Sequence, residues 1–127
     1  MPRDPADAIR QDRIRLTHMV ESARRAVRIA AGLTEESLAA DEVRLLAVVK
    51  SIEVIGEAST KVSEGTQRGV PGINWRGVRQ MRNRLIHGYD TIDPIRVWNA
   101  LTQEMPPLIV ELERALAAWP LPEPPTP

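Results

Sequence analysis

The stretch PADAIRQDRIRLTHMVESARRAVRIAA, residues 5–31, decides the fold class of this chain. Its apolar side chains recur at intervals of three, four or seven residues, at Ile9, Leu16, Val20, Ala23, Val27 and Ala30. A stripe with this period is typical of a helix that lays one face on a core. Gly32 follows and is expected to end the helix. The stretch therefore predicts a long amphipathic helix at the start of the chain.

Residues 41–63 form the second predicted helix, after a connector at residues 33–41 in which Thr34 can cap a short turn. The apolar face of this helix consists of Leu45, Val49, Ile52 and Ile55. A neighbouring stripe is expected to be solvated and salt-bridged, and it carries Lys50, Glu53, Glu57 and Lys61. Gly56 lies in mid-helix at a cost of about 1 kcal/mol relative to alanine. A close approach by another backbone would explain it.

Glycines and a proline at residues 65–72 predict a loop. Asn74 is a good N-cap for a third helix at residues 75–87, and Gly88 is its expected stop. The side chains of this helix that are expected to face inward are Trp75, Val78, Met81 and Leu85.

A fourth helix is predicted at residues 94–119, with the N-cap acid Asp93 followed by a proline at the first helical position. A proline pair at residues 106–107 must kink or break it. Its apolar stripe consists of Trp98, Leu101, Met105, Leu108, Leu112, Ala115 and Trp119. Five prolines among residues 120–127 predict a disordered tail.

Four helices with short connections, and no segment alternating with period two, predict an all-α antiparallel bundle. The length of 127 residues fits one domain, over residues 1–119. The absence of cysteine excludes disulfides, thiol catalysis and a cysteine-based zinc site. No metal or cofactor is predicted. No apolar run is long enough to span a bilayer, and the first residues lack the apolar core of a secretory signal, so we expect a cytoplasmic protein.

The charges are unevenly distributed, although the net charge is zero. No acidic residue lies between Glu64 and Asp90, whereas that stretch holds Arg68, Arg76, Arg79, Arg82 and Arg84. A local cluster of positive charge favours a phosphate-bearing partner. A composition bias also produces such clusters by chance, since the chain has fifteen arginines and two lysines.

The segment RNRLIHGY, residues 82–89, crowds polar groups at the end of the third predicted helix. Arg82 and His87 would lie roughly 140° apart on a regular helix, so a site that uses both needs the helix to end near His87 or needs a second copy of the chain. Histidine can take and return a proton near neutral pH, and the planar arginine fork matches a phosphate. Because RNA supplies its own 2′-hydroxyl nucleophile, these two groups could cleave it without metal and leave a 2′,3′-cyclic phosphate.

Each of these residues also has a purely structural interpretation. His87 could cap the helix C-terminus, Asn83 could be a solvated surface residue, and Tyr89 could pack with its hydroxyl in water. His18 has no polar partner nearby in the sequence and is assigned no role.

At these residues the sequence resembles the HEPN superfamily and, within it, the HepT toxins. The family signature is arginine, a polar residue, a short spacer, histidine, one residue and tyrosine, met here by Arg82, Asn83, His87 and Tyr89. IEVIGEAS at residues 52–59, INWRGVRQMRNRLIHGYDTIDPIRVW at residues 73–98 and MPPL at residues 105–108 are also similar to the family. The resemblance covers nearly all of the chain except the tail, with one departure, Asn74 where the family often has proline.

The resemblance implies a HEPN-type bundle of four to five helices that forms a homodimer through the motif region. It implies a metal-independent endoribonuclease toxin, with His87 in proton transfer, Arg82 on the phosphate and Asn83 as a positioning residue. Tyr89 would be the hydroxyl to which an MntA-like minimal nucleotidyltransferase antitoxin attaches AMP, and this AMPylation would block RNA.

Outside the motif, charge and position alone make Arg79 and Arg84 candidate RNA contacts. Two other functions remain open: a non-catalytic helical partner that binds nucleotide or a nucleotidyltransferase, and a structural dimerisation module. The neutral net charge favours these two, because broad RNA binding usually needs more positive surface. A small cleft, however, needs only local charge, and the motif favours the ribonuclease.

Overall fold

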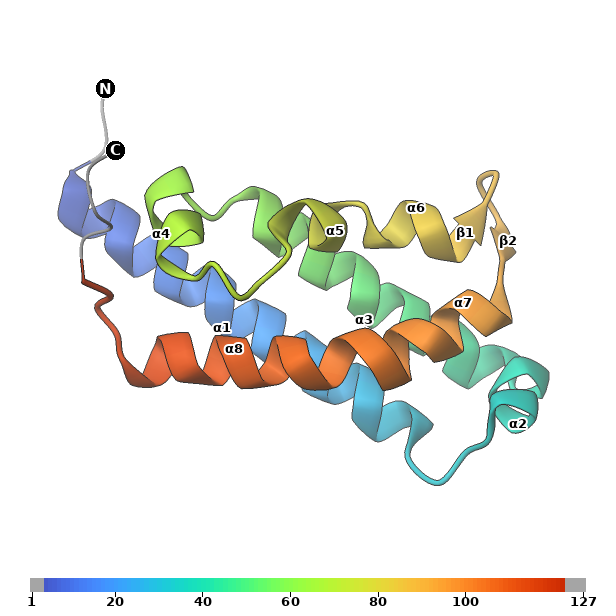
Figure 1. The fold of residues 1–127 in the computed structure, drawn as a ribbon. Coiled ribbons are helices and arrows are strands. Elements are labelled where there is room, and N and C mark those ends of the chain that lie inside the picture. The colour runs from blue at the N-terminus through green and yellow to red at the C-terminus, as the bar shows by residue number, and fades with distance from the viewer. Residues whose placement is uncertain (1–3, 123–127) are drawn as a thin grey trace.

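The computed structural model of the chain describes residues 4–122. Figure 1 shows a helical bundle with one short β-ribbon. The elements are α1 (Pro5–Ala30), α2 (Glu35–Ala40), α3 (Glu42–Thr60), α4 (Glu64–Gly69), α5 (Trp75–Arg79), α6 (Met81–Leu85), β1 (Ile86–His87), β2 (Thr91–Ile92), α7 (Pro94–Asn99), the π-helical segment η1 (Ala100–Glu104) and α8 (Met105–Ala117). Helices α1 and α3 run antiparallel along each other, α8 lies against α1, and α5 and α6 lie against α3. The predicted all-α bundle is confirmed.

The core is built from the apolar faces that the sequence predicts for the later helices. The predicted inward residues of α3, α5 and α6 are all buried, as are Leu101, Met105, Leu108, Leu112 and Ala115. In α1 the prediction is wrong for Ile9 and Val27, which are exposed. They lie at the edge of the helix face, whose centre runs through Met19, Ala23 and Ala26, all fully buried.

The capping predictions hold for three helices. The Thr34 side chain accepts from the backbone N–H of Ser37 at the start of α2, as part of a capping box. Asn74 caps α5 through the N–H of Gly77, and Asp93 caps α7. Such caps satisfy N–H groups that the first helical turn leaves without a partner.

The predicted loop at residues 65–72 is wrong in part, because α4 occupies its first half. The buried Asp12 carboxylate of α1 accepts hydrogen bonds from the backbone N–H of Ser63 at 3.0 Å and from the hydroxyls of Ser63 at 2.5 Å and Thr66 at 2.7 Å. The first turn of α4 is therefore held from α1 by a residue more than fifty positions away, and it is also capped locally by the side chain of Ser63, which accepts from the N–H of Thr66.

The third predicted helix differs most from the structure. It is divided at Gln80 into α5 and α6, and it ends at Leu85 rather than at His87. Residues 86–87 pair with residues 91–92 as an antiparallel β-hairpin, and the N–H of Asp93 donates to the carbonyl of Leu85 at 2.8 Å. Gly88 is in the hairpin loop at φ +73°, a conformation that glycine adopts readily, and it is not the stop of a helix.

The fourth predicted helix is irregular just before its proline pair, as expected. A proline lacks an N–H, and in a regular α-helix its ring would clash with the carbonyl four residues earlier. The π-helical turn η1 directly precedes α8, and its wider winding accommodates residues 106–107 without ending the helical path.

The predicted tail begins within the described residues. Leu121 is partly buried and lies against Gly69, where an added Cβ would be 3.3 Å from the leucine side chain. Residues 123–127 of the predicted tail lie outside the described residues. Within residues 4–122, no helix combines the length and the apolarity that crossing a membrane would need.

Candidate functional site

Arg82 lies on α6 and faces α3. Its Nε donates to Oε1 of Glu53 at 3.0 Å, and Glu53 also lies 3.8 Å from the ammonium of Lys50. The predicted salt-bridged stripe on α3 is thus confirmed at Glu53. Within residues 4–122 the two Nη groups of Arg82 form no hydrogen bond, so the terminal fork of the guanidinium is available to a phosphate.

Gly56 explains why α5 and α6 lie so close to α3. It is buried, and a Cβ added there would be 3.3 Å from the carbonyl oxygen of Val78 on α5. The close approach of a second backbone, inferred from a mid-helix glycine, is therefore present. It places Arg79 and Arg82 beside the last turn of α3, where they line a shared concavity.

His87 and Tyr89 lie together on the β-hairpin that follows α6. His87 is exposed on β1 opposite Thr91, and Tyr89 is 88% exposed in the three-residue loop. The packing interpretation of Tyr89 is therefore wrong. The helix-capping interpretation of His87 is also wrong, because the cap of α6 is Ile86 and His87 belongs to the strand.

The end of α6 at Leu85 removes the angular separation that a regular helix would impose on Arg82 and His87, but it does not join the two side chains by a hydrogen bond. His87 leaves the helix and need not lie 140° away from Arg82, as it would if the helix were regular. No hydrogen bond joins the two residues within the described part of the chain, and His87 does not line the concavity that Arg82 lines. Asn83 is exposed on α6, and its interpretation as a solvated residue stays open.

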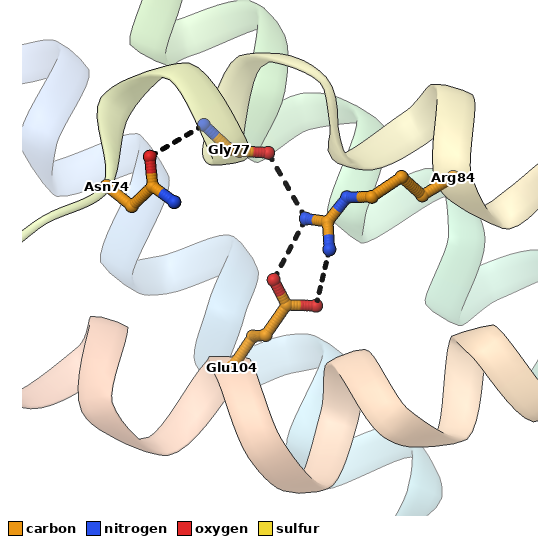
Figure 2. A network of polar contacts seen from close by, with 4 residues as sticks. All are labelled: Asn74, Gly77, Arg84 and Glu104. Atoms are coloured by element: carbon orange, nitrogen blue, oxygen red, sulfur yellow. Dashed lines mark hydrogen bonds and ion pairs between the residues drawn. The ribbon is translucent and has the colours of Figure 1, made fainter.

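Arg84 faces away from α3, toward the π-helical turn. Figure 2 shows its guanidinium between Glu104 and the carbonyl of Gly77, with hydrogen bonds of 2.9 and 3.3 Å to the two carboxylate oxygens and 3.2 Å to the carbonyl. The N–H of Gly77 donates in turn to Asn74 at 3.0 Å. This network ties α5, α6 and η1 into one corner. An RNA contact by Arg84 would have to share or break it, and that role stays a prediction.

We expect the Arg84–Glu104 pair to stabilise the fold measurably. A double-mutant cycle with Arg84→Ala and Glu104→Ala should give a coupling energy of about 1 kcal/mol in urea unfolding, at the upper end for partly exposed pairs, because the geometry is bidentate. The two side chains are 42% and 37% exposed. The same cycle on Asp7 and Arg10, an exposed pair within α1, should give a coupling near zero. Equal coupling in both cycles would contradict the structural role of Glu104.

Sequence reasoning missed the partners of the motif arginines. Glu53 was expected to form a salt bridge, but not with Arg82, and nothing in the sequence singled out Glu104. The acid-free stretch of positive charge is thus partly neutralised by carboxylates that lie 29 and 20 residues away. No three histidine, cysteine or carboxylate side chains gather in a metal-binding arrangement within residues 4–122.

The antiparallel helical bundle, with an Arg-x4-His-x-Tyr segment that runs from a short helix into an exposed hairpin, defines a protein of the HEPN type. The model of the family described as "Ribonuclease HepT-like" matches residues 19–115, most of the chain. The chain belongs to the HepT-like ribonuclease family.

Relatives of the chain have names that agree with this family. A protein of Thermococcus cleftensis named "Probable ribonuclease HepT" is 33% identical over 79 residues, which cover 62% of this chain and 72% of that protein. A protein of Methanocaldococcus jannaschii named "putative RNase" is 36% identical over 55% of this chain and 58% of its own length. A protein of Caldanaerobacter subterraneus subsp. tengcongensis, also named "putative RNase", is 26% identical over 80% of this chain and 90% of its own length. No solved structure matches. Family and names support a ribonuclease of the HEPN type.

Proposed function

We propose that this chain is a metal-independent endoribonuclease in which Arg82 binds the scissile phosphate and His87 transfers protons. The observation that carries the proposal is the pair of accessible groups at the α6–β1 junction: a guanidinium held by Glu53 through Nε alone, and an exposed imidazole on the next element. Neither side chain is buried in the core. The family and the names of the relatives support RNA as the substrate.

The proposed reaction needs a base, an acid, a cation and the RNA itself. His87 takes the proton of the 2′-hydroxyl, whose oxygen forms a bond to the adjacent phosphorus. The bond from phosphorus to the 5′-oxygen breaks, and the departing oxygen accepts a proton from an imidazolium. Arg82 stabilises the negative charge that develops on the phosphate oxygens. The products are a 2′,3′-cyclic phosphate and a 5′-hydroxyl.

A second copy of the chain would complete this site. Because Arg82 and His87 have no direct contact within the described residues, two chains related by a twofold axis would bring two arginines and two histidines to one cleft. This arrangement supplies both a base and an acid. The β-hairpin and α6 present both residues at the surface, where such an interface can form.

Incubation of total RNA with the purified protein in EDTA tests the proposal. We expect cleavage, with new 3′ ends that carry a cyclic phosphate. Intact RNA, from a preparation whose Tyr89 is shown by mass spectrometry to be unmodified, would exclude it. Binding of AMP or ATP without cleavage would then favour the non-catalytic nucleotide-binding partner.

Tyr89 is the proposed site of control by a nucleotidyltransferase antitoxin. Its hydroxyl would attack the α-phosphorus of ATP and release pyrophosphate, placing a charged nucleotide two residues from His87. The position suits an enzyme-catalysed modification, because Tyr89 is 88% exposed in a hairpin loop.

We expect Tyr89→Phe to escape this control. With ATP, magnesium and an MntA-like nucleotidyltransferase, the wild-type protein should gain the mass of AMP and its cleavage of RNA should fall to background. The variant should gain no mass and should keep its activity, because Tyr89 is the only tyrosine of the chain. An adduct on the variant would place the modification elsewhere.

A further inference from the structure

The concavity beside α6 is a candidate binding groove that shares Arg82 with the proposed catalytic site, whereas its other lining residues have no part in the catalytic proposal. Its volume is about 430 Å³, and it lies between the C-terminal end of α3 and the α5–α6 corner. We call it the α3–α5 groove, and its lining residues are Gly56, Glu57, Thr60, Lys61, Arg79 and Arg82. The volume falls within the range of small-ligand sites, which suits one nucleotide unit.

Two of the three cations of the α3–α5 groove form no ion pair with a carboxylate within the described residues. Within residues 4–122, Lys61 has no ion-pair partner, and the only hydrogen bond of the Arg79 side chain goes to the neutral amide oxygen of Gln67, at 3.3 Å. By contrast, Arg84 is bound to the carboxylate of Glu104. Two positive charges of the groove are therefore available to an anion.

Gln67 holds Arg79 in place without cancelling its charge. The Gln67 amide nitrogen donates to the carbonyl of Val62 at 2.9 Å, which leaves the amide oxygen for the guanidinium. The backbone carbonyl of Gln67 accepts from the indole N–H of Trp75 at 3.1 Å, so this residue is anchored at both ends. A cation oriented by a neutral group keeps its attraction for a phosphate and loses less side-chain freedom on binding.

The acidic groups near the groove reduce its charge but leave it positive. Glu57 lines the groove, and Glu53 lies behind Arg82. Three cations and one carboxylate line the groove, with a formal charge of +2, and Glu53 lowers this to +1. A phosphodiester carries a single negative charge, so the groove fits one backbone phosphate.

We propose that the α3–α5 groove binds the RNA backbone phosphate that neighbours the scissile one, with Lys61 and Arg79 as its ligands. Arg82 lines the groove and is also the proposed ligand of the scissile phosphate, so the two phosphate positions would adjoin at this residue. The choice of RNA as the source of the phosphate rests on the proposed function. The groove itself requires no cleavage, and binding can be measured separately.

The test uses a fluorescent 2′-O-methyl RNA oligonucleotide, which has no free 2′-hydroxyl and cannot be cleaved by the proposed route. Its affinity is measured at several salt concentrations for the full chain and for the double variant Lys61→Gln/Arg79→Gln. For single strands, each phosphate contact adds about 0.7 to the magnitude of the slope of log K against log salt. For the double variant we therefore expect this magnitude to be smaller by about 1.4 and the affinity to be roughly tenfold lower. Arg79→Lys should keep most of the slope.

The matched control is Arg25→Gln/Arg28→Gln, which removes two exposed cations of α1 that have no ion-pair partner within residues 4–122. It changes the net charge equally, and its slope should equal that of the unmodified chain. Equal slopes for the groove variant and the unmodified chain would overturn the inference, as would equal losses in the groove and control variants.

Two further measurements separate this inference from the proposed function. If the chain leaves natural RNA intact but the groove variant still loses oligonucleotide affinity, the groove stands and the ribonuclease fails. If the chain cleaves RNA and the groove variant binds normally, the ribonuclease stands and the groove fails. We also expect ATP to displace the oligonucleotide from the unmodified chain but not from the groove variant. If the groove binds ATP but not the oligonucleotide, RNA is not its ligand and the inference is overturned.

Discussion

Replacement of His87 by alanine is expected to reduce RNA cleavage to background, a loss of at least about 10²–10⁴-fold, which is the usual contribution of a general acid or base. If both copies in a dimer contribute an imidazole, the variant lacks base and acid together. The stability of the fold should not change, because His87 is exposed. Cleavage of a labelled RNA in EDTA and thermal unfolding of the same preparation measure the two effects.

His18→Ala provides the matched control for this experiment. It removes the only other histidine, which is exposed on α1 and has no assigned role, so its cleavage rate should equal that of the wild-type protein. A His87→Ala protein that folds, forms dimers and still cleaves RNA at the wild-type rate would exclude the imidazole from the reaction.

Gly56→Leu is expected to have the largest effect on stability, a loss of about 3 kcal/mol, at the upper end for overpacking of a core. The reason is the 3.3 Å separation between a Cβ at Gly56 and the carbonyl oxygen of Val78. A longer side chain at this buried position has to move the backbone of α5 away from α3. The shift would also carry Arg79 and Arg82 away from the last turn of α3, so RNA affinity should fall even where the variant remains folded. Urea unfolding measures the first effect and oligonucleotide binding the second.

Gly65→Ala is the control for this substitution, because a Cβ at that helical position would meet only the end of the Arg68 side chain at 4.0 Å. It should stabilise the protein by up to about 1 kcal/mol, the difference in helix propensity between glycine and alanine. Gly56→Ala should gain less than this, because the propensity gain is offset by the tight contact with Val78. If Gly56→Leu unfolds at the same urea concentration as the wild-type protein, α5 does not depend on the small residue.

The positions of the candidate site residues could be predicted only in part. Arg82 lies on α6 and His87 on β1, the next element, so the helix ends before His87, which was one of the two arrangements that the sequence left open. Their surroundings were not predictable, because the partners of Arg82 and Arg84 come from α3 and η1 and not from neighbouring residues. The two arginines, two positions apart, therefore face different parts of the bundle.

The sequence by itself determined the long helices α1 and α3 and the starting points of α2, α5 and α7. The stripe of α3, the caps at Thr34, Asn74 and Asp93, and the irregularity before residues 106–107 depend on interactions within one or two helical turns. Periodicity and capping act over that range, and so they can be read from residue spacing.

Only the tertiary structure decided the shape of the functional region. Helix α4 depends on Asp12, the hairpin at His87 depends on a backbone pairing with residues 91–93, and the α3–α5 groove depends on the contact of Gly56 with α5. The contacts of Asp12 with α4 and of Gly56 with α5 join residues that are distant in sequence, and the hairpin pairing interrupts the period of the helix. The physical reason is that a local pattern specifies which face of a helix is apolar, whereas packing specifies which neighbour that face meets.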